Sequence, residues 1–185
     1  MRVAIFGGSF DPPHTGHEQI IQKALQKLDI DVLFVVPTYL NPFKKNFFAP
    51  PNLRYKWVKK LLSPYKKTKV LDYELRQNRP VPTIETVKYL LNKYDIDKIY
   101  LIIGADNLKK LHHWKDFDTL RKLVTFVVAT REEIPIPKGL QKLEVHANIS
   151  STKLRNNIDK SMLPEIIADE IWDYYLNKEK NAQQD

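Results

Sequence analysis

The sequence predicts an α/β fold in which a doubly wound, mostly parallel sheet is followed by C-terminal helices. Strand-like and helix-like patterns alternate along the 185 residues, an order typical of such sheets. Continuous apolar runs such as residues 100–103 indicate strands that are buried on both faces, as in a parallel sheet. A glycine-containing turn follows the first apolar run directly. We therefore expect ligands to bind beyond the carboxyl ends of the strands.

In order along the chain, strands are expected at residues 2–6, 32–37, 69–71, 98–103, 124–129 and 143–145. Helices are expected near residues 16–28, 52–62, 84–94, 107–111, 117–122, 152–158 and 163–176. The strands are short apolar runs. The helices repeat apolar residues at the spacing of one helix face, as Ile21, Ala24 and Leu28 do in the first of them.

Two segments have prolines and no helical period, residues 38–51 and 131–139. Long irregular loops in compact domains are often functional lids. The polar segment 178–185 is expected to be a frayed tail. The length fits one domain over residues 1–185.

The composition is that of a basic globular chain, with 43% hydrophobic residues, 28% charged residues and a formal net charge of +8. Such an excess of positive charge attracts acidic partners, whether nucleotides, nucleic acid or anionic membranes. The longest apolar runs are too short to span a membrane, and no secretory leader is expected. Cysteine is absent, which excludes disulfides and thiolate chemistry. We therefore expect a cytoplasmic protein with polyanionic substrates.

The most informative stretch is residues 7–17, which read GGSFDPPHTGH between the first strand and the first helix. Gly7 and Gly8 let the backbone approach a ligand closely, and the helix start offers free N–H groups and a positive dipole end. The pattern is neither GxGxxG nor GxxxxGKS, so neither a dinucleotide fingerprint nor a P-loop fits. The stretch predicts a phosphate site.

His14 and His17 place two imidazoles on the first turn of that helix. Transfer of a nucleotidyl group needs positioned donors, because negative charge develops on the phosphates. Three other interpretations compete with this one. A histidine can cap or pack the helix, His17 can lie on the surface, or both can bind zinc together with Asp11.

A second motif, ISSTKLR, occupies residues 149–155 near the other end of the chain. Ser150 or Ser151 is expected to be a helix N-cap, with hydroxyls and free N–H groups facing one place. Arg155 lies near the same turn, and this combination can hold the β- and γ-phosphates of a triphosphate. The alternative is an ordinary cap beside a surface arginine.

Three further positions draw attention. Asp106 follows Gly104 at a strand end, where a carboxylate either caps a helix or accepts hydrogen bonds from ribose hydroxyls. Trp114 is either a core residue or a platform for a ligand. Thr83 is either an ordinary N-cap or a ligand contact.

Together these motifs resemble those of the nucleotidyltransferases. Residues 14–17 match the HxGH signature, residues 149–155 match ISSTxxR, and residues 103–106 match IGxD. The longer first string resembles the bacterial nicotinate mononucleotide adenylyltransferases. The resemblance implies a Rossmann-like nucleotidyltransferase fold. It also implies transfer of the adenylyl group of ATP to nicotinate mononucleotide, giving nicotinate adenine dinucleotide (deamido-NAD) and pyrophosphate in NAD biosynthesis, with Mg²⁺ accompanying ATP.

The resemblance also implies roles for individual residues. The catalytic set is His14, His17 and Lys44. The ATP-binding set is Gly7, Gly8, Ser9, Phe10, His17, Gly104, Asp106, Arg131, Ile149, Ser150, Ser151, Thr152 and Arg155. The nicotinate mononucleotide set is His14, Lys44, Thr83, Trp114 and Lys115. No protein-bound metal is implied.

The chain departs from the family pattern at three places. Residues 81–83 are Val-Pro-Thr where relatives often have Ser-Tyr-Thr, Phe43 stands for a histidine, and Glu132-Glu133 replace Pro-Gly. The alternatives are an adenylyltransferase that prefers nicotinamide mononucleotide or phosphopantetheine, and a basic nucleic-acid-binding module. No KMSKS string or anticodon-binding extension supports the last. We expect no nucleic-acid or membrane partner, and the sequence allows a homo-oligomer.

Overall fold

The computed structural model describes residues 1–40, 47–147 and 149–182. Within them the chain forms a six-stranded sheet in the order β3-β2-β1-β4-β5-β6, and each neighbouring pair of strands is parallel. The strands are β1 Arg2–Gly8, β2 Val32–Pro37, β3 Thr68–Val70, β4 Lys98–Gly104, β5 Thr125–Ala129 and β6 Gln141–Leu143.

The helices alternate with these strands. Between strands lie α1 Thr15–Lys27, α2 Pro51–Leu62, α3 Tyr73–Arg76, α4 Thr83–Lys93, the 3₁₀ helix η1 Ala105–His113, and α5 Phe117–Leu123. After the last strand come α6 Ser151–Asn156, the 3₁₀ helix η2 Lys160–Met162, and α7 Glu165–Ala182.

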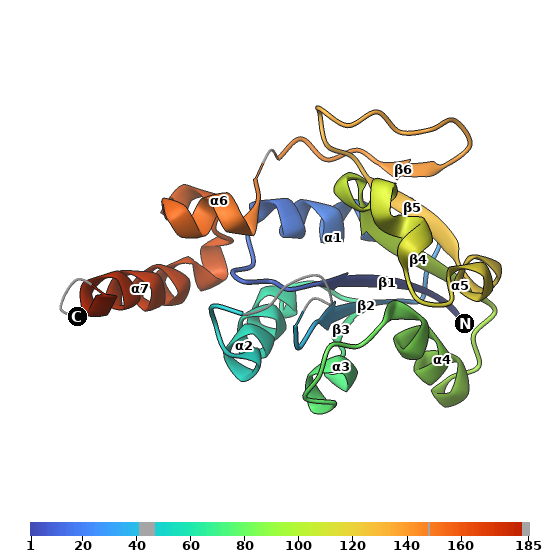
Figure 1. Ribbon diagram of the computed structural model, residues 1–185, viewed down its shortest axis with the longest axis horizontal. Coiled ribbons are helices and arrows are strands. Elements are labelled where there is room, and N and C mark those ends of the chain that lie inside the picture. Colours follow the sequence, from blue (N-terminus) through green and yellow to red (C-terminus); the bar gives the residue numbers. More distant parts are fainter. Residues whose placement is uncertain (41–46, 148, 183–185) are drawn as a thin grey trace.

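Helices cover both faces of the sheet, because alternate strand residues point to opposite sides. Ala4 and Phe6 of β1 belong to one buried cluster with residues of α1, α2 and α7. Val3 and Ile5 belong to a second cluster with residues of α4 and α5. Figure 1 shows α1 on one side of the β1–β2–β3 strands and α3 and α4 on the other. The chain changes sides between β3 and β4, so the switch point lies between the neighbouring strands β1 and β4.

The predicted fold class is confirmed, and the differences from the sequence are local. The strands expected at 69–71 and 143–145 are β3 and β6, which begin and end slightly earlier. Both are three-residue edge strands with too few positions to show a period, and their register is set by pairing, Leu33 with Thr68 and Val127 with Gln141. The helix expected at 107–111 is the longer 3₁₀ helix η1. The short elements α3 and η2 have no sequence pattern and were not predicted.

The C-terminal helix also differs from expectation. Residues 178–182 belong to α7, where the sequence suggests a polar tail, and residues 183–185 lie outside the described residues. Lys178 Nζ donates to the backbone oxygen of Phe48 at 2.5 Å. That contact gives this polar end of the helix a partner far away in the sequence.

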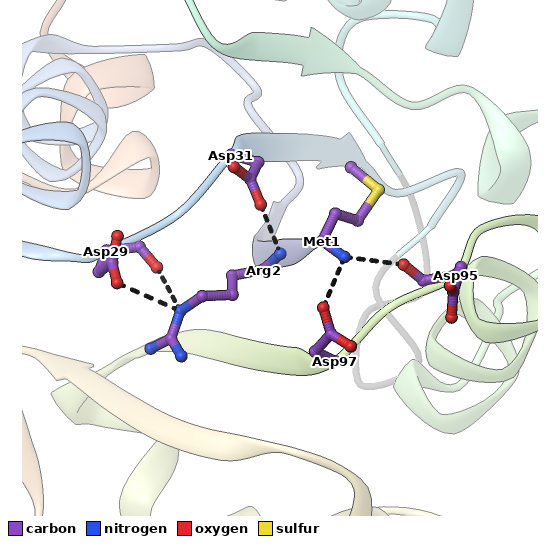
Figure 2. A network of polar contacts seen from close by, with 6 residues as sticks. All are labelled: Met1, Arg2, Asp29, Asp31, Asp95 and Asp97. Carbon is purple, nitrogen blue, oxygen red and sulfur yellow. Dashed lines mark hydrogen bonds and ion pairs between the residues drawn. The ribbon is translucent and has the colours of Figure 1, made fainter.

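At the amino ends of β1, β2 and β4, acidic residues hold the first two residues of the chain (Figure 2). The Met1 nitrogen lies 2.8 Å from Asp97 Oδ2 and 2.9 Å from the Asp95 oxygen. The Arg2 backbone N–H donates to Asp31 Oδ2 at 2.7 Å, and Arg2 Nε donates to the Asp29 oxygen at 2.9 Å. This network ties the strands together at the edge of the sheet opposite their carboxyl ends.

A buried cation organises the other edge. Arg54 stands on the apolar face of α2 with Trp57, Val58 and Leu61, and only 1% of it is exposed. Its guanidinium donates to four backbone oxygens at 2.6–2.9 Å, those of Ser9, Thr38, Tyr39 and Ala49. Burial lowers the pKa of Arg54, and the nearby Asp11 carboxylate opposes this shift. One side chain thus joins the glycine-rich turn, the end of β2 and the entrance to α2.

Replacement of this arginine is expected to be costly. Arg54→Met fills similar space but leaves those backbone oxygens without donors, so we expect the free energy of unfolding to fall by about 3–5 kcal/mol. Urea denaturation followed by circular dichroism measures the change. Lys59→Met, at an exposed position of the same helix, is the matched control and should stay within about 0.5 kcal/mol of the unmodified protein. A loss for Arg54→Met no larger than for the control would contradict the role assigned to Arg54.

Candidate active site

The carboxyl ends of three adjacent strands bring predicted residues to one edge of the sheet. Strand β1 ends at Gly8 and its neighbour β4 ends at Gly104, which pairs with Ala129 at the end of β5. Gly7 is exposed at this edge, and Arg131 follows β5 by two residues. Residues that are distant in the sequence therefore surround the switch point, where ligands bind in open α/β sheets.

The two histidines form a reciprocal cap at the start of α1. His14 is the N-cap, and its Nδ1 accepts from the backbone N–H groups of Gly16 at 3.1 Å and His17 at 3.4 Å. In return, His17 Nδ1 accepts from the His14 backbone N–H at 3.1 Å. The rings stack with centroids 3.7 Å apart. His14 therefore caps the helix, which is one of the alternatives to a catalytic role. The cap uses only one ring nitrogen, so it does not exclude a second role for the other.

This cap determines which proton each ring carries. Because both Nδ1 atoms accept hydrogen bonds, the network assigns the proton of each neutral ring to Nε2. Burial, and to a smaller extent the charge of Arg131, lower the pKa of His14 to about 4. The pKa of His17 is also well below its usual value, first because of burial and then because of His14 and Arg131. At neutral pH both imidazoles are uncharged, and each has one N–H to donate.

At two glycines, an added Cβ would meet a neighbouring side chain. A Cβ on Gly16 would lie 2.8 Å from His14 Cε1, so the residue between the capping histidines must lack a side chain. A Cβ on Gly104 would lie 2.5 Å from Asp106 Oδ1. The Asp106 carboxylate therefore rests against the backbone at the end of β4. The N-cap of η1 is Gly104, so the capping alternative for Asp106 is wrong.

Phe10 supports His17 from the glycine-rich turn. It is 1% exposed and has a φ of +49°, a left-handed conformation that is uncommon for a residue with a side chain. Its ring meets His17 edge-on with centroids 4.7 Å apart and packs on Phe6 at 5.5 Å. The strained turn thus places an aromatic ring where it limits the orientation of the His17 imidazole.

The C-terminal motif lies against the first motif. Ser150 is the N-cap of α6 and accepts from the Lys153 N–H at 3.2 Å, which confirms the predicted cap. The Ser151 hydroxyl donates to the Pro12 oxygen at 2.9 Å. Arg155 Nη1 donates to the Asp11 oxygen at 2.5 Å. The two motifs from opposite ends of the chain therefore form one site.

Arg131 connects a third segment to this site. Its Nη2 donates to the Ile149 oxygen at 3.0 Å, and its charge acts on both histidines. It also lines a cavity of about 330 Å³ between the 130–136 loop and the chain around β6. The other lining residues are Thr130, Glu132, Ile134, Ile136, Lys142, Glu144, Val145 and His146. Arg131 is thus placed between the histidines and the start of the ISSTKLR motif.

Asp11 was considered in the sequence only as a zinc ligand, and the structure shows a different use. It is 3% exposed. Its carboxylate accepts from the N–H groups of Phe48 and Ala49 at 2.7 and 2.9 Å and from the Tyr175 hydroxyl at 3.0 Å. Burial and this carboxylate raise the pKa of Tyr175. Within the described residues, His, Cys, Asp and Glu side chains form no group of three or more that could hold a metal ion.

The residues expected to contact the pyridine ring lie in the layer of α4 and α5. Thr83 is the first residue of α4, whose N-cap is Pro82, so the N-cap alternative for Thr83 is wrong. Trp114 is half-buried after η1 and packs on the second core cluster, and Lys115 beside it is exposed. His14 and His17 lie at the start of α1, on the other face of the sheet. The histidines and the residues expected at the pyridine ring can therefore meet a common ligand only across the carboxyl edge of the sheet. Lys44 lies outside the described residues.

Two buried polar atoms at this edge lack a hydrogen-bond partner among the described residues, Thr38 Oγ1 and Trp114 Nε1. Thr38 directly follows β2, and its N–H donates to the Gly8 oxygen at 2.9 Å. Buried polar atoms are nearly always hydrogen-bonded. The sequence contains no signal that singles out Thr38.

The fold and the paired histidines define the class of this protein as a nucleotidyltransferase domain. The chain belongs to the cytidylyltransferase-like family, whose model matches residues 5–157. It is 56% identical over 173 residues to a Sulfurimonas denitrificans protein named "probable nicotinate-nucleotide adenylyltransferase", covering 94% of each chain. It is 50% identical to a protein of the same name from Campylobacter jejuni, covering 98% of this chain and 100% of the relative. These matches confirm the resemblance found in the sequence.

Solved structures show the same fold. The Plasmodium falciparum nicotinic acid mononucleotide adenylyltransferase complexed with NaAD aligns with a TM-score of 0.76 at 20% identity, covering 95% of this chain and 96% of that one. Among the helices that the structure describes, none is both long and apolar enough to cross a membrane.

The lowered pKa of His14 has a consequence for stability. Between about pH 4 and pH 6.5, the His14 side chain is mostly protonated in the unfolded chain and mostly neutral in the folded protein. Stability is therefore retained above pH 6.5 and lost as the pH falls from 6.5 towards 4, with a slope of up to about 1.4 kcal/mol per pH unit for this group.

His14→Asn tests this slope, because asparagine is a good N-cap that does not titrate. Urea denaturation of both proteins between pH 7.5 and 4.5 should show a shallower loss in the variant. Titration of Glu74, whose pKa burial raises to about 7, is common to both proteins and cancels in the comparison. Equal slopes would show that His14 is not held neutral by the fold.

Proposed function

We propose that this chain transfers the adenylyl group of ATP to nicotinate mononucleotide, giving nicotinate adenine dinucleotide and pyrophosphate in NAD biosynthesis. The observation that carries the proposal is the single site made by the capped histidines and the ISSTKLR helix start. The names of the relatives point to the same reaction. The Plasmodium falciparum structure contains NaAD, which is the expected product.

The reaction needs no protein nucleophile. The 5′-phosphate of the mononucleotide attacks the α-phosphorus of ATP in line. As the new P–O bond forms, the bond to pyrophosphate breaks, and the pyrophosphate leaves with its electron pair. Catalysis then consists of positioning and of stabilising the charge on the phosphates. The neutral rings of His14 and His17 donate Nε2–H to phosphate oxygens, while Arg131 and Arg155 supply positive charge.

The remaining roles follow the family resemblance. For ATP we propose backbone and side-chain contacts in the glycine-rich turn, at the end of β4 and along the 149–155 motif, made by Gly7, Gly8, Ser9, Phe10, Gly104, Asp106, Ile149, Ser150, Ser151 and Thr152. For the mononucleotide we propose His14, Lys44, Thr83, Trp114 and Lys115, with the Trp114 ring against the pyridine.

Mg²⁺ is proposed to enter with ATP as part of the substrate, held mainly by phosphate oxygens and water. Entry of Mg²⁺ as an ATP complex fits this site, because the side chains proposed around the phosphates are cations and neutral donors. A cytoplasmic location remains a prediction from the sequence, which allows a homo-oligomer without requiring one.

Removal of one donor should slow the chemical step. If His17 stabilises charge that develops in the transition state, His17→Ala should lower kcat about 10²–10³-fold and change ATP affinity much less. Steady-state pyrophosphate release and direct ATP binding give the two numbers. Because His17 also accepts from the His14 N–H, circular dichroism must show that the variant is folded. Unchanged turnover in a folded variant would exclude this role.

Substrate choice tests the proposed function directly. Nicotinate carries a carboxylate, which only accepts hydrogen bonds, whereas the amide of nicotinamide has an NH₂ group that only donates. Donors on Thr83 and on the backbone after Trp114 suit the carboxylate and are left unpaired by the NH₂ group. We expect a clear kcat/KM preference for nicotinate mononucleotide in a pyrophosphate-release assay with each mononucleotide.

Thr83→Ala should shrink that preference through the KM for the mononucleotide and leave ATP binding intact, and Thr83→Ser, which keeps the hydroxyl, is the matched control. Equal or better use of nicotinamide mononucleotide by the unmodified protein would refute the substrate assignment. Failure to release pyrophosphate with any mononucleotide would refute adenylyl transfer.

A further inference from the structure

An exposed aromatic ring lies close to the arginine of the C-terminal motif. The Arg155 guanidinium carbon is 4.1 Å from the centroid of the Phe48 ring, although the two residues belong to α6 and to the segment before α2. Phe48 is 51% exposed. A guanidinium this close to an aromatic ring is attracted by the electrons of its face.

The backbone of Phe48 is held from two sides. Its N–H donates to the buried carboxylate of Asp11 at 2.7 Å. Its carbonyl oxygen accepts from Lys178 Nζ at 2.5 Å and from the Tyr174 hydroxyl at 3.4 Å, both on α7. The ring therefore projects from a fixed position, even though it is exposed.

The contact with the ring restrains the guanidinium, and its hydrogen bonds within the described residues use only part of its donors. The hydrogen bonds that Arg155 makes within the described residues go to the Asp11 oxygen at 2.5 Å and to Thr152 Oγ1 at 3.4 Å. A guanidinium has five N–H groups, and these two hydrogen bonds leave others that can donate to an anion.

We propose that Phe48 is a positioning residue that holds Arg155 in the orientation in which it binds the β- and γ-phosphates of ATP. This inference rests on the proposed function. Phe48 does not touch the phosphates; it acts by limiting the rotamers of a long side chain before the nucleotide arrives, so that less freedom is lost on binding. The same ring lies 5.9 Å from Lys178 Nζ, so a second cation is near it.

The test compares ATP with AMP, which lacks the β- and γ-phosphates. Phe48→Leu keeps an apolar side chain and removes the ring. It should weaken ATP binding about three- to thirty-fold, the range of a cation–π contact, and leave AMP binding unchanged. Phe48→Tyr keeps the ring and should retain ATP affinity. Phe47→Leu makes the same chemical change at the adjacent residue, whose ring contacts Tyr39 and Arg54, and should not separate ATP from AMP.

A double-mutant cycle separates positioning from a general structural effect. If Phe48 acts through Arg155, adding Phe48→Leu to Arg155→Ala should cause no further loss of ATP affinity. Calorimetric titration with each nucleotide measures all these affinities without requiring turnover.

Three outcomes would overturn the inference. They are equal weakening of ATP and AMP by Phe48→Leu, unchanged ATP affinity in that variant, and additive losses in the double variant. Failure of the unmodified protein to bind ATP would overturn the proposed function together with this inference. Normal pyrophosphate release with any one of the three outcomes would overturn the inference alone.

Discussion

The site depends on the buried guanidinium of Arg54. Three irregular segments meet at the carboxyl edge of the sheet, and their carbonyl groups have no strand partner there. A planar cation with donors on several sides satisfies four of these oxygens at once, from Ser9 to Ala49. No ordinary neutral side chain has enough donors in that geometry, and an unmatched buried carbonyl is costly. The glycine-rich turn, the end of β2 and the start of α2 are thereby held as one unit.

Asp11 complements this cation from the other side of the same segments. Its carboxylate accepts from the N–H groups of Phe48 and Ala49. Arg54 donates to the Ala49 oxygen in the same segment, so the chain before α2 is bound through both its N–H groups and a carbonyl group. Tyr175 extends the connection to α7, and Arg155 extends it to α6. The C-terminal helices are therefore part of the candidate site, although they follow the last strand.

The electrostatics of the site divide into two parts. The stacked pair His14 and His17 is neutral, since burial and Arg131 lower both pKa values, and it contributes oriented donors. Positive charge comes from Arg131 and Arg155, which reach the site from other elements. Neutral donors next to each other avoid the repulsion that two stacked imidazolium ions would suffer. This arrangement suits a reaction in which charge on phosphates must be stabilised throughout.

The order of the strands along the chain, most of the helices, the histidine pair, a serine cap at residue 150 or 151 and the family can be read from the sequence alone. They are local patterns: apolar runs, glycines beside a helix start and short motifs. Arg54 interrupts the apolar face of α2 with a charge, and this departure from the helical pattern can be seen in the sequence. The roles of Asp11, Phe48 and Tyr175 become visible only in the folded chain. These roles arise from contacts between residues up to 164 positions apart, such as Tyr175 with Asp11, and long-range hydrogen bonds leave no periodic trace in the chain.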